Sequence, residues 1–181
     1  MRRWTLAMVL LLTAAPLDAQ RGPTLTDVRE RYLAAVEDED AINPAMDAIR
    51  HLRQQGNADA ALLMAYEGAL TTLRAKHGFW PPRRLMHLND GLYTLDQMVA
   101  EHPDHVEIRY LRLMSCFYLP GLLGRTWSVD EDLDALATLL PDVADRYAPD
   151  LYETVVRFVL ENAELDRERR AALERALRDH G

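Results

Sequence analysis

The sequence predicts an all-α protein made of stacked antiparallel helical hairpins, with about eight helices. Helix start signals recur from residue 24 onward, and apolar residues recur at helical spacing in the segments between them. Few windows alternate strictly between apolar and polar residues or gather β-branched residues, so a sheet is not expected. Because the connections are short, we expect neighbouring helices to pack side by side, as in an α-solenoid or a helical bundle.

The expected helices follow one another closely along the chain. They cover residues 25–37, 44–55, 58–76, 83–101, 105–118, 129–140, 151–161 and 166–179, with a short extra turn at 142–147. The second begins where Asn43 precedes Pro44, since a proline is favoured at the first helical position. Capping boxes, each a sign of a helix start, are expected at Asp104 with Glu107, at Ser128 with Glu131 and at Asp150 with Glu153.

The helix at 105–118 is expected to lie at the centre of the stack. Apolar residues surround it on nearly every side, as in a helix packed between neighbours: Val106, Ile108, Tyr110, Leu111, Leu113, Met114, Cys116, Phe117 and Tyr118. The helix at 166–179 differs, because it has one apolar stripe and a charged opposite face. We therefore expect this last helix to cap one end of the stack.

Residues 91–103 and the helix after them resemble part of a tetratricopeptide repeat (TPR). Gly91, Leu95, Met98 and Pro103 have the spacing of the second helix of that repeat, with Met98 in place of a small residue. The segment from His102 to Arg125 is also similar to a pattern in uncharacterised exported bacterial helical proteins. The resemblance implies paired helices that approach closely at the small positions, in a TPR-like stack.

The first nineteen residues fit a cleavable secretory signal peptide. Arg2 and Arg3 form a positive start, residues 4–15 are uncharged and mostly apolar, and Ala19 is a small residue at the expected cut. This apolar run is too short to span a bilayer as a helix. The prediction is therefore a signal peptide at 1–19, a short segment at 20–23 and one helical domain at 24–181, located in the periplasm or secreted, without a stable membrane anchor.

The amino-acid composition indicates what kind of organism the protein comes from and which classes of partner it is not expected to bind. Lys76 is the only lysine among 21 basic residues, an arginine bias that favours a GC-rich bacterial genome. The formal net charge is -8, and loss of Arg2, Arg3 and Asp18 would make it -8 - 2 + 1 = -9. Such an acidic domain is a poor candidate for binding nucleic acid or an anionic membrane. The single cysteine, Cys116, excludes an internal disulfide.

The sequence shows little sign of catalytic chemistry. Ser115 and Ser128 are the only serines, and neither lies in a nucleophile elbow. Cys116 lies among apolar neighbours and is expected to be a buried structural thiol. His102 and His105 flank a helix boundary rather than one helical face, so we expect them to face solvent instead of binding metal. No cofactor and no metal are expected, and enzymatic activity is not indicated.

Arg109 and Arg112 are the most informative polar residues. They lie three apart on one face of an otherwise apolar helix, so each guanidinium must be paired or must open onto a cleft. Asp90, Asp96 and Glu101 on the preceding helix are available partners. Two interpretations follow, an internal ion-pair lock that fixes the hairpin, or a groove that receives a ligand carboxylate or phosphate.

Aromatic and arginine residues flank the same hairpin. Trp80 and Trp127 could anchor a partner protein, or they could plug the ends of the core. The candidate residues for binding a ligand or partner are Arg109, Arg112, Trp80, Trp127, Tyr110, Arg84 and Arg125.

The expected function is that of an exported, non-catalytic helical scaffold of the bacterial cell envelope that binds a protein or peptide. The alternative is a small-ligand binder or enzyme that uses an arginine-lined cleft around Arg109 and Arg112. The two differ in what they require of the structure: a shallow groove with aromatic residues for the first, and a deep polar pocket that holds the arginines for the second.

Overall fold

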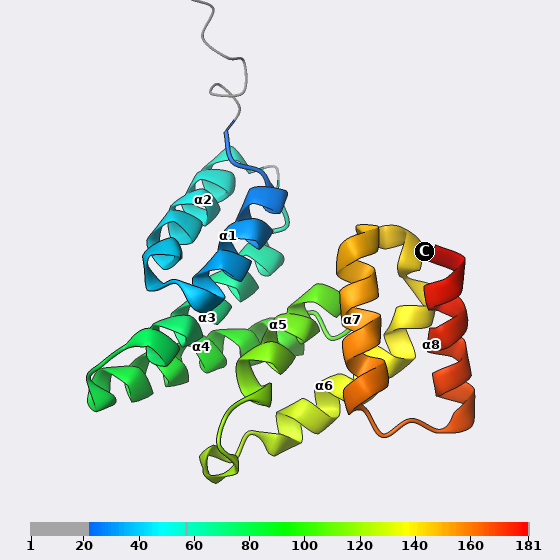
Figure 1. Cartoon of the computed structure of the whole chain (residues 1–181). Coiled ribbons are helices and arrows are strands. Elements are labelled where there is room, and N and C mark those ends of the chain that lie inside the picture. Colours follow the sequence, from blue (N-terminus) through cyan, green and yellow to red (C-terminus); the bar gives the residue numbers. More distant parts are fainter. Residues whose placement is uncertain (1–21, 57, 181) are drawn as a thin grey trace, which may run out of the picture.

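The computed structural model describes residues 22–56 and 58–180, and this part of the chain is helical with no strand (Figure 1). The all-α prediction of packed hairpins with about eight helices is confirmed. The helices are α1 (Leu25–Glu37), α2 (Ile42–Gln55), α3 (Ala60–His77), α4 (Pro81–Glu101), α5 (Val106–Phe117), α6 (Thr126–Leu139), α7 (Pro149–Asn162) and α8 (Arg167–His180). Short 3₁₀ turns lie at Glu39–Ala41, Gly121–Leu123, Leu140–Asp142 and Ala144–Arg146.

The predicted signal peptide lies outside the described residues. Within residues 22–56 and 58–180, no helix combines the length and the apolar character that a bilayer crossing requires.

The helix boundaries agree with the predictions to within a few residues, but the predicted caps are wrong. Helix α2 already begins at Ile42, and the side chain of Asn43 accepts a hydrogen bond from Arg74 instead of capping the helix. The capping box predicted at Asp150 does not form, because α7 begins earlier: Ala148 is its cap residue and Pro149 is in its first turn.

The other two predicted boxes also fail, because their glutamates bind elsewhere. His105 caps α5 through its ring Nδ1, at 3.3 Å from the amide of Ile108. Ser128 lies inside α6 and donates to the carbonyl of Arg125. A complete capping box does occur at Thr24 and Asp27, where α1 begins.

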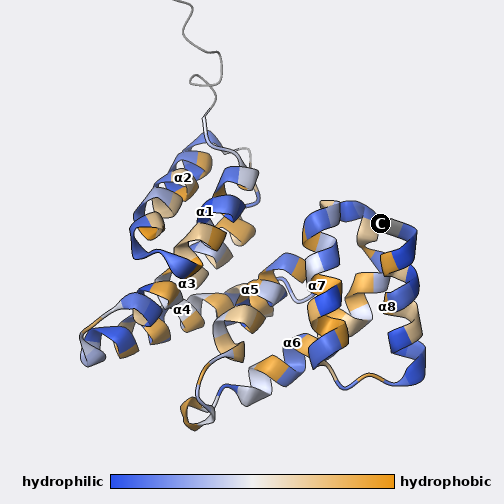
Figure 2. Cartoon of the chain, in the orientation of Figure 1, coloured by the Kyte–Doolittle hydropathy of each residue, from blue (hydrophilic) through white to orange (hydrophobic). Residues whose placement is uncertain are grey.

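Helix α5 joins two hydrophobic cores. The first core is formed by α1 to α5 and includes Ile108, Leu111 and Cys116 from α5. The second is formed by α5 to α8 and includes Val106 and Leu113 from α5. Figure 1 shows α1 to α3 at one end of the molecule and α7 and α8 at the other, and Figure 2 shows the apolar stripes on these helices. The prediction that the helix at 105–118 is central is therefore confirmed.

Helices α3 and α4 approach each other closely at two glycines, Gly68 and Gly91. A Cβ atom added to Gly91 would lie 2.6 Å from the carbonyl oxygen of Gly68 and 2.8 Å from the backbone nitrogen of Thr72. A Cβ added to Gly68 would lie 3.1 Å from the carbonyl oxygen of Gly91. These are backbone atoms of a packed helix, so neither can move away without moving the helix. Gly91 is thus required for the spacing of the α3–α4 hairpin.

We expect Gly91→Ala to lower the free energy of unfolding by about 1–3 kcal/mol, because the added methyl group forces α3 and α4 apart. Gly121→Ala is the matched control, since a Cβ at Gly121 has no atom within 4 Å. Urea unfolding followed by circular dichroism measures both variants. Equal stability of the two variants would show that the helices have room to adjust at Gly91.

Candidate functional site

The two central arginines form a buried ion-pair network between α4, α5 and α6. Arg112 donates from Nε to Asp132 Oδ2 at 2.8 Å and from Nη2 to Asp132 Oδ1 at 2.8 Å. Arg109 Nη1 donates to the same Asp132 oxygen at 2.9 Å, and its Nε donates to the carbonyl of Pro103. Asp132 therefore holds two guanidinium groups at once.

Two further carboxylates complete this network. Glu131 Oε2 lies 2.9 Å from Arg112 Nη2, and Asp96 Oδ1 lies 3.3 Å from Arg112 Nη1. Of the three partners that were predicted for the two arginines, Asp96 is the one that pairs with Arg112. Within the described part of the chain, Asp90 and Glu101 form no ion pair with either arginine.

Burial makes this network a structural element rather than an open cleft. Arg112 is 3% exposed and Asp132 is 0% exposed. Burial disfavours the charge of Arg112, but the hydrogen bonds and charge of Asp132 outweigh this effect and raise the pKa of Arg112. A ligand carboxylate could reach the guanidinium only by displacing Asp132 or Glu131. The geometry thus favours the ion-pair lock over the ligand groove.

Arg125 and Trp127 lie at the edge of the same network. Arg125 donates to both oxygens of Asp96, at 2.9 and 2.7 Å, and its guanidinium carbon lies 5.0 Å from the centre of the Trp127 ring. Arg112 lies over the same ring at 5.8 Å. Trp127 keeps 52% of its surface exposed, so it covers the arginines without being buried itself. The stacking of guanidinium groups on indole adds a cation–π contact to the ion pairs.

A second buried charge on α5 was not predicted. Glu107 is 2% exposed and accepts hydrogen bonds from Arg29 on α1, at 2.8 Å from Nε and 2.7 Å from Nη2. The hydroxyl of Tyr66 on α3 also donates to Glu107 Oε1. Burial, and then the charge of Glu107, raises the pKa of Tyr66, which keeps the phenol protonated as a donor. Glu107 thus ties α5 to both α1 and α3.

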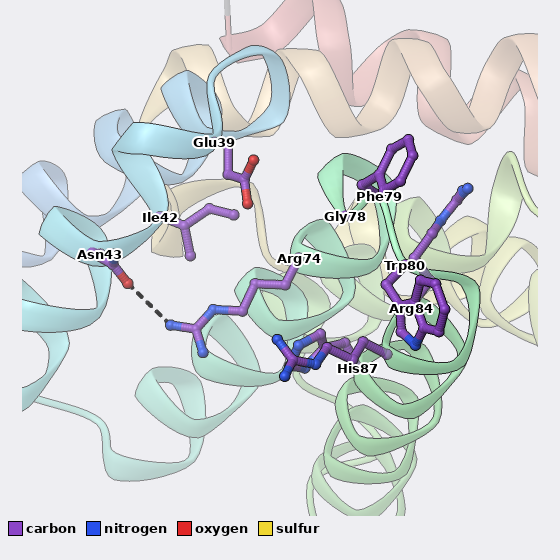
Figure 3. A pocket seen from close by; sticks show the side chains of 10 residues that line it. Glu39, Ile42, Asn43, Arg74, Gly78, Phe79, Trp80, Arg84 and His87 are labelled. Carbon is purple, nitrogen blue, oxygen red and sulfur yellow. Dashed lines mark hydrogen bonds between the residues drawn. The ribbon is translucent and has the colours of Figure 1, made fainter.

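A basic pocket opens at the other end of α4, between the starts of α2 and α4 and the end of α3. Its volume is about 510 Å³. The residues that line it are Glu39, Ile42, Asn43, Arg74, Gly78, Phe79, Trp80, Arg83, Arg84 and His87. Figure 3 shows Glu39 and Asn43 on one side, Phe79, Trp80, Arg84 and His87 on the other, and Arg74 between them. We call this set of residues the basic pocket.

Local structure explains why the basic pocket is open. Gly78 ends α3, and Trp80 precedes Pro81 and Pro82, which fix the start of α4. The short connection therefore projects its side chains outward, with Phe79 95% exposed and Trp80 61% exposed. Both residues lie at the rim instead of plugging the core.

The arginines of the basic pocket lack carboxylate partners among the described residues, in contrast to Arg109, Arg112 and Arg125. Arg74 donates to Asn43 Oδ1 at 3.1 Å, and Arg84 Nε donates to the carbonyl of Ala75 at 2.9 Å. These bonds position two guanidinium groups through neutral acceptors. Their positive charge therefore remains available to an external anion.

The structure divides the seven predicted site residues into three places. Arg109, Arg112, Arg125 and Trp127 belong to the buried network, whereas Trp80 and Arg84 belong to the basic pocket. Tyr110 belongs to neither and packs against Phe158 with ring centres 6.0 Å apart. Arg74 and His87 are residues of the pocket that sequence reasoning missed.

Groups suited to metal binding or nucleophilic catalysis do not gather in this part of the chain. Residues 22–56 and 58–180 contain no group of three histidine, cysteine or acidic side chains that could hold a metal ion. Ser115 donates to the carbonyl of Leu111 in its own helix, and Cys116 is buried in the first core.

Comparisons of the chain with protein-family models, with curated proteins and with solved structures give no match.

Proposed function

We propose that the chain is an exported, non-catalytic helical scaffold of the bacterial cell envelope, and that it binds a protein partner at the basic pocket. The observation that carries this proposal is the coincidence, in one pocket, of exposed aromatic side chains with arginines that have no carboxylate partner among the described residues. Tryptophan and arginine are the residues that most often anchor protein interfaces.

The rest of the molecule supports a scaffold role. Helix α5 is held by buried ion pairs on both sides, to α1 and α3 through Glu107 and to α6 through Asp132. Of these helices, α3 also lines the pocket, through Arg74, so the bond between Tyr66 and Glu107 helps to hold one wall of the pocket in place. A wall that is already fixed presents its side chains without a large loss of conformational freedom on binding.

The alternative function, a carboxylate or phosphate site at Arg109 and Arg112, has less support. Both guanidinium groups already bind Asp132, which is fully buried. Binding of an external anion there would require Asp132 to lose its partners inside the protein, at a cost of several kcal/mol.

Capture of a cross-linked partner tests the proposal. The full chain with a C-terminal tag is produced in a bacterium and cross-linked in intact cells, and the captured proteins are quantified by mass spectrometry. We expect Trp80→Ala to reduce recovery of a specific partner by at least about tenfold, as for a central tryptophan anchor.

Tyr118→Ala is the matched control, because Tyr118 is also an exposed aromatic residue, at 75% against 61% for Trp80, and it lies on the α5–α6 connection outside the residues that line the pocket. A partner lost with Tyr118→Ala but kept with Trp80→Ala would place the interface elsewhere and contradict the proposal. Circular dichroism of both variants establishes that each is folded.

A further inference from the structure

We infer that the basic pocket recognises an acidic peptide segment of the partner protein, with carboxylates held by Arg74, Arg83 and Arg84 and an apolar side chain set against Trp80. This inference rests on the proposed function and names the chemistry of its partner. The pocket, the charge distribution and the exposed aromatic rim each support it.

Charge is the first argument. Three arginines and His87 line the pocket, and Glu39 is the one carboxylate among its lining residues. The whole chain, by contrast, carries a formal net charge of -8. A local positive site on an acidic protein attracts an anionic ligand, while the remaining surface repels it. The electrostatic field of the protein therefore favours binding at the basic pocket.

Hydrogen-bonding capacity is the second argument. Arg84 uses Nε on the carbonyl of Ala75, and Arg74 uses one Nη on Asn43. Within residues 22–56 and 58–180, neither arginine forms an ion pair with a carboxylate. A guanidinium group that keeps free donors in a fixed orientation binds a carboxylate with two parallel hydrogen bonds.

The aromatic rim favours a peptide over a small free anion. Phe79 and Trp80 line the pocket together with the arginines, and they are 95% and 61% exposed. A bare carboxylate or phosphate would leave this apolar surface in water. A peptide that carries an apolar side chain between acidic ones would cover this apolar surface and neutralise the arginines as well.

A fluorescently labelled, end-capped peptide of sequence Glu-Asp-Phe-Glu-Asp is the probe, titrated with the full chain by fluorescence anisotropy at low salt. The matched peptide Gln-Asn-Phe-Gln-Asn keeps the shape and removes the charge. We expect the acidic peptide to bind at least about tenfold more tightly than the neutral one, and its binding to weaken as salt rises.

Arg83→Glu tests the pocket itself, because Arg83 is exposed and its replacement does not disturb the bonds of Arg74 and Arg84. Arg175→Glu on the exposed face of α8 makes the same change in net charge and is the control. We expect Arg83→Glu to weaken the acidic peptide by at least about tenfold and Arg175→Glu to weaken it by less than about twofold. Arg83→Gln, which only neutralises the charge, is expected to give an intermediate loss.

Three results would overturn the inference: equal binding of the two peptides, equal loss with Arg83→Glu and Arg175→Glu, or displacement of the peptide by citrate at a concentration that matches the peptide's own affinity. The last result would assign the pocket to small polycarboxylates. Loss of the cross-linked partner with Trp80→Ala would still support the proposed function in each of these cases, so the two proposals can fail separately.

Discussion

Arg112→Ala is expected to lower the free energy of unfolding by about 3–5 kcal/mol, the usual cost of breaking a buried ion pair by removing one partner. The substitution leaves the Asp132 carboxylate inside the protein with Arg109 as its remaining partner, and it leaves Glu131 and Asp96 without a contact from Arg112. For a chain of this length the loss corresponds to about 6–20 °C in melting temperature. Differential scanning calorimetry and urea unfolding measure it.

Arg157→Ala is the control for Arg112→Ala. Arg157 forms an exposed pair with Glu153 one helical turn away, so its removal is expected to cost less than about 1 kcal/mol. If Arg112→Ala proves as mild as Arg157→Ala and the protein then loses affinity for an anion, the lock interpretation is wrong and Arg112 is a ligand-binding residue.

Glu107→Ala is expected to lower the free energy of unfolding by about 3 kcal/mol, because it removes the hydrogen-bond acceptor of two side chains at once. The guanidinium of Arg29, which is 26% exposed, loses both of its hydrogen bonds to Glu107. The Tyr66 hydroxyl loses its acceptor inside the first core. A buried donor without an acceptor costs about 1–3 kcal/mol, and the lost charge pair adds to this.

Glu67→Ala provides the comparison for Glu107→Ala. Glu67 pairs with Arg53 on the surface, and both side chains are about half exposed, so we expect a loss below about 1 kcal/mol. Urea unfolding with an unchanged m-value would show that only the native state is affected. A loss at Glu107 no larger than that at Glu67 would mean that water replaces the missing carboxylate.

The helical class and the central position of α5 could be predicted because both depend on patterns within the chain. Apolar residues on all sides of a helix require neighbours on all sides, whichever those neighbours are. The same reasoning showed that Arg109 and Arg112 needed partners, and it identified Asp96 as one of them.

Two acidic residues of the buried ion pairs were missed because they were assigned to local motifs. Glu107 and Glu131 occupy the fourth position of a capping-box pattern, in which a glutamate reaches back to the helix start. In the structure each binds a distant arginine instead, Arg29 in one case and Arg112 in the other. A charge-assisted bond to a buried or partly buried guanidinium is stronger than a cap at a solvent-exposed terminus, so tertiary contacts override the local pattern.

The basic pocket could be predicted only in part. Trp80 and Arg84 were identified because aromatic and arginine residues occur together in the segments that flank the central hairpin. Arg74 and Asn43 are 31 positions apart and meet only through the packing of α2 on α3. A single sequence contains no local pattern that predicts a contact between two residues so far apart.

The sharing of α5 between two cores has a consequence for the order of folding during synthesis. Glu107 finds its partners 41 and 78 positions earlier in the chain, so its contacts can form as soon as α5 is made. Arg109 and Arg112 must wait for Asp132, which follows them by 23 and 20 positions. A nascent chain that ends after α5 would therefore expose Arg109 without a carboxylate partner, Arg112 with Asp96 as its one carboxylate partner, and the apolar side chains of Val106 and Leu113. Helix α6 therefore provides partners for the N-terminal half and also begins the C-terminal half. If the chain were divided between α5 and α6, each fragment would expose charged and apolar side chains that have lost their partners.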